Sequence, residues 1–394
     1  MSTASATSAQ STATLDVDAL LDDRSTHIVV CCGAGGVGKT TTAAAMALRA
    51  AERGRTVVVL TIDPARRLAQ SMGLTELDNT PRIVSAVDGE AGGELQAMML
   101  DMKRTFDEIV IAHADEARAQ QILANPFYQA LSSSFSGTQE YMAMEKLGQL
   151  QQQGDWDLII VDTPPSRSAL DFLDAPERLG RFLDGRLIRV LSAPARAGGR
   201  AYMKVVSAGI GMFTNVLTKV IGGQLLKDLS LFVNGLETMF GGFRERADAT
   251  YRLLKAPGTA FIVVAAPEKD ALREAAYFVE RLAAEGMPLA GLVVNRMHPV
   301  GAAGLGAERA VAAAEALEEH GDHPVAAATL RLHAERAVLA TRERRLRERF
   351  TSAHPGVPVV PVHAFAQDIH DLDGLRAVGA ELAGEGLAEA GRSA

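Results

Sequence analysis

A glycine-rich segment near the N-terminus constrains the fold of this chain more than any other feature. Gly33 and Gly38 enclose four residues, and Lys39 and Thr40 follow directly, in the order G-x-x-x-x-G-K-T. A short apolar run precedes the segment, and an alanine-rich run follows it. A buried strand that turns through glycines into a helix is the context in which this motif binds phosphate. The sequence therefore predicts a P-loop for a nucleoside triphosphate.

The residue types of the loop indicate how phosphate would be held. Glycines let backbone N–H groups turn inward around the phosphates. Lys39 reaches the outer phosphates, and the Thr40 hydroxyl can bind Mg²⁺. A glycine-rich turn without a ligand is the alternative, but it does not explain why the spacing, the Lys-Thr pair and the flanking elements all agree. The predicted loop residues are Gly33, Gly35, Gly36, Val37, Gly38, Lys39, Thr40 and Thr41.

Short apolar runs without alternation recur along the chain and indicate strands that are covered on both faces. Helical patterns separate them, so we expect a doubly wound, mainly parallel α/β sheet. The P-loop motif is not repeated, which predicts one nucleotide site per chain. The expected strands are 27–32, 55–62, 157–162, 259–265, 289–295 and 358–362.

The domain organisation follows from what interrupts this alternation. We expect one P-loop ATPase domain at 25–380, with a helical subdomain inserted at about 103–153 and 170–254. Residues 1–24 are rich in Ser, Thr and Ala, which is typical of a mobile tail. Residues 381–394 are expected to form a flexible C-terminal tail.

Two carboxylates end predicted strands near the loop. Asp162 could hold Mg²⁺ directly or through water, and an ordinary helix N-cap is the alternative. Asp63 precedes Pro64 and could position or activate a water molecule for catalysis. A turn residue before proline is the alternative interpretation of Asp63.

The segment Asn295-Arg296-Met297-His298 bears on the choice of base. Guanine sites usually present Asn-Lys-x-Asp, and this segment lacks the Asp. An Asn side chain alone suits the donor and acceptor of adenine, although a turn residue at a strand end is the alternative. The predicted ligands are therefore ATP and Mg²⁺.

Composition narrows the partners and the compartment. The formal net charge is −8, so no basic footprint suggests nucleic acid. The arginine-rich run at 342–349 contains interleaved Glu343 and Glu348, as in a solvated helix. Cys31 and Cys32 are the only cysteines and offer no disulfide framework. Without a signal peptide or an apolar span, we expect a protein of the cytoplasm, with peripheral membrane association as a second option.

Several motifs together resemble one known family. The matching segments are Gly35–Thr41, Asp63-Pro64-Ala65, Asp162-Thr163-x-Pro165, Val293–Asn295, 137–140, 166–176 and 267–274. In this order, over about residues 27–376, the chain resembles the arsenical pump-driving and tail-anchored-protein-targeting ATPases of the deviant-Walker P-loop class. It is most similar to the actinobacterial branch, whose members tend to occur as two unlike paralogues.

The resemblance implies a nucleotide-dependent dimer, a homodimer or a heterodimer with a paralogue, whose P-loops face each other. It implies that Asp63 positions the attacking water in a first switch and that Asp162 and the residues after it form a second switch. It implies that Asn295 and the loop at Pro361, Val362 and His363 hold adenine. The helical subdomain would move with nucleotide state and handle a client, such as a hydrophobic helix or a membrane protein.

One departure from the family concerns catalysis. The family carries a second lysine just before Gly35, which reaches the partner's nucleotide, and this chain has Ala34. A cation at a transferring phosphoryl group contributes several kcal/mol, to order of magnitude. Three explanations stay open: hydrolysis is slow, an unlike paralogue supplies the lysine, or an arginine replaces it. The candidate arginines are Arg66, Arg67 and Arg167.

Two further observations concern partners. The cysteine count leaves no Cys-x-x-Cys zinc clamp and no set of three thiols for arsenite. Residues 185–227 contain seven cations and no carboxylate among apolar side chains, which fits either a client groove or subdomain core with a basic face. The predicted function is an ATP-hydrolysing dimeric switch. The alternatives are a nucleotide-gated adaptor with little hydrolysis and, more remotely, a partitioning ATPase.

Overall fold

The computed structural model describes residues 13–62, 67–126, 128–129, 132, 138–164, 245–302, 304–321 and 323–385. The chain divides into two compact units. The first, named the sheet unit, comprises Met1–Met99, Gly154–Ala169 and Leu254–Ala394; the second, the helical unit, comprises Leu100–Gln153 and Leu170–Leu253. Asp63, Arg66, Arg167 and the basic stretch 185–227 lie outside the described residues, as does the Arg67 side chain.

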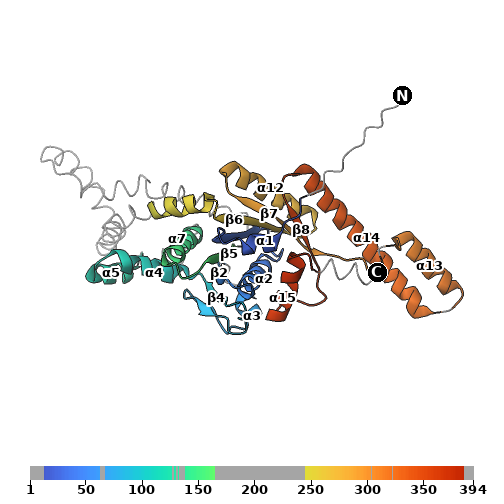
Figure 1. The fold of residues 1–394 in the computed structure, drawn as a ribbon, viewed down its shortest axis with the longest axis horizontal. Helices are drawn as coiled ribbons and strands as arrows, with labels where there is room; N and C mark the ends of the chain where they lie inside the picture. The colour runs from blue at the N-terminus through green and yellow to red at the C-terminus, as the bar shows by residue number, and fades with distance from the viewer. Residues whose placement is uncertain are drawn as a thin grey trace, which may run out of the picture. The chain divides into compact units, whose positions relative to one another are not determined.

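An eight-stranded sheet forms the centre of the sheet unit, in the order β3-β4-β2-β5-β1-β6-β7-β8 (Figure 1). All neighbouring strands are parallel except β3 and β4. This confirms the predicted doubly wound, mainly parallel sheet. The strands are β1 (Ile28–Gly33), β2 (Thr56–Thr61), β3 (Arg82–Ile83), β4 (Glu94–Met99), β5 (Leu158–Asp162), β6 (Thr259–Ala265), β7 (Leu289–Met297) and β8 (Val359–His363).

No local sequence pattern predicts strands β3 and β4. The β3 strand has two residues, and β4 contains no β-branched or aromatic side chain. Strand propensity mostly reflects packing on a half-buried surface, so neither segment has a recognisable pattern. They pair only because β2 offers its edge to β4.

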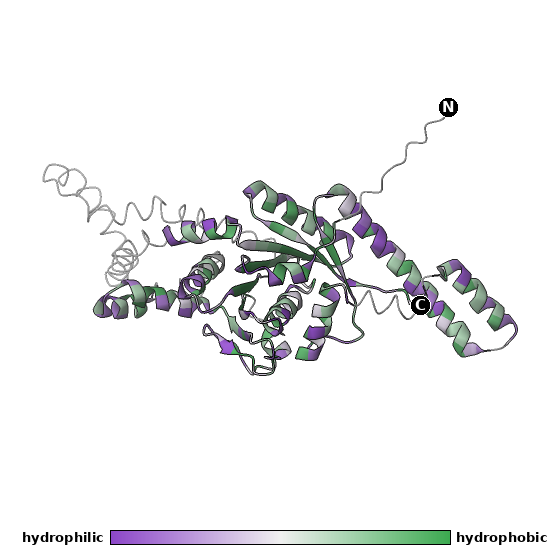
Figure 2. Ribbon diagram, in the orientation of Figure 1, coloured by the Kyte–Doolittle hydropathy of each residue, from purple (hydrophilic) through white to green (hydrophobic). Residues whose placement is uncertain are grey.

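Helices cover both faces of the sheet. Helix α12 (Lys269–Glu285) lies on one face, and α2 (Lys39–Glu52) and α15 (Leu372–Leu382) lie on the other (Figure 1). The central strands are the most hydrophobic part of the ribbon (Figure 2), and β1, β5 and β6 are buried along their whole length. Continuous Val and Ile runs form such strands because both of their faces are removed from water.

Helix α1 (Val17–Asp22) lies within the segment that the sequence analysis expected to be a mobile tail. Asp16 caps this helix by accepting the Ala19 N–H at 2.9 Å, and Val17 and Leu21 are completely buried. At the other end, Leu382 is also buried and ends α15. Two or three apolar residues in a polar segment are a weak signal, so local patterns predict neither α1 nor the last two residues of α15.

A helical hairpin connects β7 to β8. Helix α13 (Ala307–Glu319) packs along the first half of α14 (Pro324–Ala353), and the helices bury mainly alanines against each other (Figure 1). The buried alanines are Ala310, Ala314, Ala327, Ala334, Ala337 and Ala340. Small side chains let two helices approach closely, so the hairpin is held by backbone proximity more than by a large apolar core.

The helical unit contains α4 (Met102–His113), α5 (Glu116–Leu123) and α7 (Thr138–Gln153). Ion pairs connect its parts: Arg246 Nε lies 2.8 Å from a Glu145 oxygen, and Lys146 Nζ lies 3.1 Å from Glu108. The sheet unit also contains a short helix, α3 (Arg67–Ser71). Among the described helices of the whole chain, none has the length and apolarity needed to cross a membrane.

Candidate nucleotide site

The predicted P-loop joins β1 to α2, and its backbone requires glycine at several points. Gly33, Gly36 and Gly38 have φ angles of 148°, 75° and 98°. A Cβ atom on Gly33 would lie 2.1 Å from the Val264 carbonyl oxygen, and one on Gly38 would lie 2.2 Å from Asn295 Nδ2. The loop can therefore pass this close to β6 and β7 only without side chains at these two positions.

Lys39 begins α2 and is buried, with 5% of the residue exposed. Its Nζ donates to the Ala34 carbonyl at 2.7 Å, so the side chain folds back over the loop that precedes it. Lys39 also lines the cavity described below. This places a cation at the centre of a loop whose N–H groups can surround an anion.

Asp162 connects three neighbouring strands at their carboxyl ends. Its Oδ2 accepts from the Thr40 hydroxyl at 2.7 Å and from the Thr61 hydroxyl at 2.9 Å. The parallel register places Asp162 beside both Cys31 and Thr61, and it is completely buried. A carboxylate and hydroxyl oxygens are hard ligands of the kind that Mg²⁺ prefers. The residues present therefore fit a magnesium ion held by Thr40 and Asp162.

Asn295 ends the regular part of β7 and supports the loop. Its Nδ2 donates to the Val37 carbonyl at 2.9 Å, and its Oδ1 accepts from the Arg296 backbone N–H at 2.9 Å. Arg296 has a φ of 61°, a left-handed conformation that is uncommon outside glycine. The local strain turns the chain at the position where Asn295 meets the P-loop.

These elements surround a cavity of about 660 Å³ at the carboxyl ends of the strands. Of the predicted loop residues, Gly36, Gly38, Lys39, Thr40 and Thr41 line it. Asn295 and His363 also line it, whereas the side chains of Val37 and Val362 lie in the apolar core. The carboxyl edge of a doubly wound parallel sheet is the place where such folds bind ligands.

Comparison with known proteins identifies the family. A family model described as Anion-transporting ATPase matches residues 26–304. The chain belongs to this family. A protein named ATPase GET3 from Malassezia globosa is 29% identical over 164 residues, which cover 42% of this chain and 46% of the relative.

Two further relatives are matched over a longer range. ATPase GET3 of Ajellomyces dermatitidis is 25% identical over 280 residues, which cover 71% of this chain and 75% of that protein. ATPase get3 of Neurospora crassa is 24% identical over 282 residues, which cover 71% and 76%. Membership of the anion-transporting ATPase family supports an ATP-dependent activity and confirms the family resemblance seen in the motifs.

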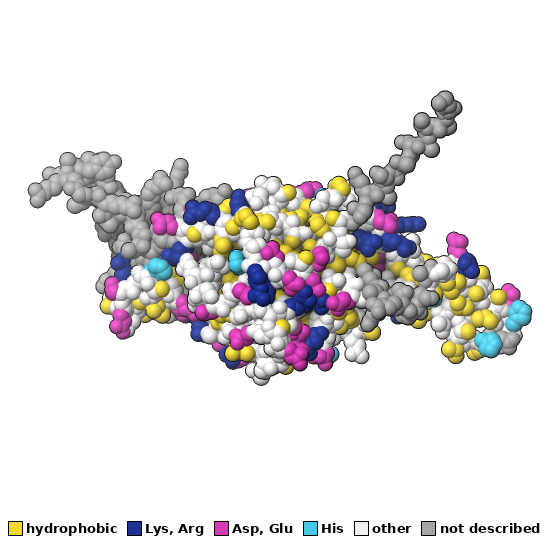
Figure 3. All heavy atoms as spheres, in the orientation of Figure 1, with side chains coloured by type: hydrophobic (Ala, Val, Ile, Leu, Met, Phe, Trp, Pro, Cys, Tyr) yellow, Lys and Arg dark blue, Asp and Glu magenta, His cyan; other side chains and the backbone are white. Residues whose placement is uncertain are grey.

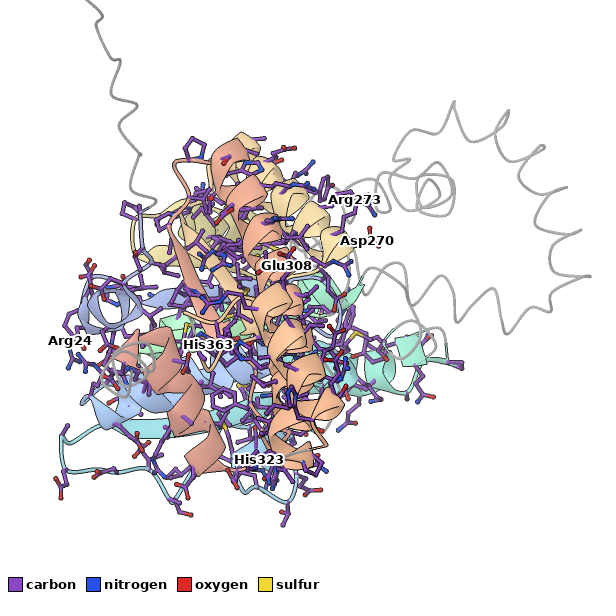
Figure 4. All side chains as sticks on the ribbon, turned by 90° about the vertical axis from the view of Figure 1, so that its right-hand side faces the viewer. Arg24, Asp270, Arg273, Glu308, His323 and His363 are labelled. Atoms are coloured by element: carbon purple, nitrogen blue, oxygen red, sulfur yellow. The ribbon has the colours of Figure 1, made fainter. Side chains whose placement is uncertain are left out.

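Two histidine–glutamate pairs lie at the cavity of this anion-transporting ATPase family member. His363 was predicted as a site residue, whereas His298 and the two glutamates were not. His298 lines the cavity, and buried Glu343 accepts from its backbone N–H at 2.8 Å and lies 2.7 Å from its Nδ1. His363 lies at the end of β8 (Figure 4), with its Nδ1 2.8 Å from Glu381 Oε2. An ionised carboxylate only accepts, so in each pair Nδ1 is the donor to the glutamate.

The sequence contained one weak signal for the first pair. Glu343 interrupts an arginine-rich run, a pattern that is typical of a solvated helix face. Its burial depends on α14 packing beside the end of β7, which no local pattern predicts.

The two cysteines behave as core residues. Burial raises the pKa of the Cys32 thiol to about 12 and that of the Cys31 thiol well above its ordinary range. Neither thiol is suited to bind a metal as thiolate.

Proposed function

We propose that this chain is a Mg²⁺-dependent molecular switch that binds and hydrolyses ATP. The observation that carries the proposal is the convergence of Lys39, Thr40 and Asn295 around one cavity, with buried Asp162 held directly behind Thr40 by a hydrogen bond. Lys39 and the loop N–H groups neutralise the phosphates, and Thr40 and Asp162 hold the metal. When bound, Mg²⁺ supplies neutralisation of charge on the outer phosphates. Asn295 and the segment Pro361–His363 hold adenine, and the His298 imidazole is a further polar group at the cavity.

Asp63 is proposed as the residue that positions the attacking water. It directly follows Ile62, whose N–H donates to the Asp162 carbonyl at 3.0 Å, and this places the end of β2 beside the metal-binding carboxylate. The test is the Asp63→Asn variant, assayed for phosphate release and for equilibrium binding of Mg²⁺-ATP. We expect turnover to be lost and ATP affinity to be retained. Retained turnover would remove Asp63 from this role.

A second candidate is a nucleotide-gated adaptor that hydrolyses little ATP by itself, and Ala34 favours it. The Ala34 side chain is 8% exposed and belongs to the apolar core, so this position supplies only a carbonyl, to Lys39. We propose that an unlike paralogue supplies the missing cation. The Ala34→Lys variant should then raise the turnover of the chain alone by about tenfold or more. Ala34→Met is the matched control, because it adds length without charge.

We further propose that the chain dimerises, resides in the cytoplasm or at a membrane surface, and handles a hydrophobic or membrane-linked client. The supports are the family membership and the basic, apolar stretch at 185–227. The test is cross-linking from Phe213, with ATP and with ADP, in cells that contain the native partners. Nucleotide-dependent capture of an apolar segment is expected. Cross-linking from an exposed site such as Ile111 is the control. If the cross-linker at Ile111 captured the same segments as the one at Phe213, the client role would be contradicted.

A further inference from the structure

A second cavity lies at the base of the α13–α14 hairpin, within the sheet unit. Its volume is about 930 Å³, compared with about 660 Å³ for the nucleotide cavity. It is bordered by the first turn of α12, the loop before α13, the start of α13 and the middle of α14. None of its lining residues lines the nucleotide cavity, so the two are separate sites.

The lining of this cavity is strongly cationic. Six basic side chains line it, together with a single carboxylate, that of Glu308 at the start of α13 (Figure 4). The six are Lys269, Arg309, Arg342, Arg344, Arg345 and Arg349. Figure 3 shows Lys and Arg side chains gathered over the part of α14 nearest the sheet. This concentration contrasts with the formal net charge of −8 for the whole chain.

The described residues supply no carboxylate partner to these six cations within ion-pair distance. Other arginines on the same helices are paired: Arg331 lies 2.6 Å from Glu318, and Arg273 lies 3.0 Å from Asp270 (Figure 4). The helices therefore have carboxylates to offer, but place all of them except Glu308 outside the cavity. Unneutralised like charges at close range repel one another, and a bound anion would relieve this repulsion.

The remaining lining is partly apolar. Val300, Leu305 and Leu346 contribute hydrophobic surface, and Thr341 contributes a hydroxyl. Gly306 caps α13 without a side-chain hydrogen bond, so no side chain competes for the first N–H groups of that helix. A ligand with an anionic group and a less polar body would match both parts of the lining.

We propose that this cavity binds a small soluble compound that carries phosphate groups, at a site distinct from the P-loop. Guanidinium groups bind phosphate through paired N–H···O bonds, which makes an arginine cluster better suited to phosphate than lysines would be. The volume lies within the range of small-molecule sites. The basic residues border one cavity and do not form an extended stripe, which disfavours a nucleic-acid backbone as ligand.

The test uses the full chain with Lys39→Ala, so that the P-loop contributes little phosphate binding, and inorganic pyrophosphate as the probe in isothermal titration calorimetry. In this background we compare Arg345→Gln/Arg349→Gln with Arg336→Gln/Arg347→Gln. Both pairs remove the same charge from α14, but only the first pair lines the cavity. Pyrophosphate should bind the parent with one site, about tenfold more weakly in the cavity pair, and almost unchanged in the control pair.

Three outcomes would overturn the inference. The first is that the parent does not bind pyrophosphate, and the second is that both variant pairs lose the same pyrophosphate affinity. The third is that the parent binds only to vesicles of phosphatidylcholine with phosphatidylglycerol. The last would assign the cations to a lipid surface. Arg309→Gln provides an independent variant from α13, should the cavity pair fail to fold, and it should also weaken pyrophosphate binding. Because the probe is assayed without a functional P-loop, failure of the ATPase proposal would not affect the result.

Discussion

The amino ends and the carboxyl ends of the central strands form two sides of the sheet, here called the amino edge and the carboxyl edge. Each edge carries a buried basic residue, and the two residues have different roles. At the amino edge, Arg55 is 1% exposed and donates to Asp157 and to the carbonyls of Leu21, Asp23 and Thr26, at distances of 2.6–3.1 Å. At the carboxyl edge, Lys39 is 5% exposed and lines a cavity.

The difference separates structural from functional burial of charge. The Arg55 guanidinium uses its donors on protein oxygens from α1, from the segment between α1 and β1, and from Asp157 just before β5. No ligand is needed to compensate for its burial. Lys39 lies where helix and loop N–H groups already favour an anion. The Arg55 charge is enclosed by protein and holds the fold together, whereas Lys39 lines a cavity that a ligand can enter.

The largest expected effect is on the amino edge. Arg55→Met should lower the free energy of unfolding by about 3–5 kcal/mol, because it leaves buried carbonyls and part of Asp157 without a donor. Urea unfolding measures this, with Arg53→Met as the control, whose exposed pairs with Asp18 and Asp22 contribute about 0–1 kcal/mol. ATP affinity per folded molecule should be unchanged. If Arg53→Met lowered the free energy of unfolding as much as Arg55→Met, the burial of Arg55 would have no special structural role.

The next effect is on the carboxyl edge and should appear in function. Lys39→Ala should change stability by about 1 kcal/mol, the usual net contribution of a hydrogen bond such as the one that Nζ donates to the Ala34 carbonyl. Turnover of ATP should fall by about 10²–10³, equivalent to about 2.7–4 kcal/mol. The two are measured by urea unfolding and by phosphate release. If Lys39→Ala unfolded the protein as strongly as Arg55→Met, Lys39 would be a structural residue.

Gly38→Ala tests the fit of the loop against β7. A Cβ atom would clash with Asn295 and would hold a strained positive φ, so we expect a cost of about 1–3 kcal/mol. Part of this cost should disappear when Asn295→Ala removes the obstructing amide, which a double-mutant cycle of unfolding free energies would detect. Fully additive costs would mean that backbone strain alone makes Gly38 necessary.

Glu343→Gln tests whether the base of the hairpin contributes to the nucleotide cavity. The glutamine keeps one acceptor but no longer fixes the proton on His298 Nδ1, so we expect ATP affinity to fall by about threefold to tenfold, near 0.5–1.5 kcal/mol. Equilibrium ATP binding measures this, and Glu348→Gln on the exposed side of α14 is the control. Reduced stability with unaltered ATP affinity would make Glu343 a purely structural residue.

The smallest effect returns to the amino edge and depends on pH. The hydrogen bonds from Arg49 to Asp18 lower the pKa of this carboxyl below its ordinary value of 3.8. The pair therefore stabilises the fold above that value, and its contribution is lost as the pH falls through the lowered pKa. Asp18→Asn should cost about 0.5–1 kcal/mol at neutral pH. The cost should vanish in strong acid when unfolding is measured across pH, and a pH-independent cost would contradict the ion pair.

Local patterns predicted those parts of the fold whose signal is local. The six expected strands are apolar runs, and each is present because its burial on both faces agrees with its composition. The α1 helix, β3 and β4 were not predicted, since each depends on a surface supplied by distant segments. Arg55 also gave no local signal, because its acceptors lie in distant segments, around residues 21–26 and at Asp157.

The candidate site divides in the same way. The sequence by itself determined the P-loop, because its residues are consecutive and the glycines, Lys39 and Thr40 fix a local backbone path. Tertiary structure alone decided which distant side chains meet that loop. Asp162 reaches Thr40 across 122 residues, and Asn295 reaches Val37 across 258. The register of a parallel sheet sets these meetings, and this register depends on the packing of the whole core.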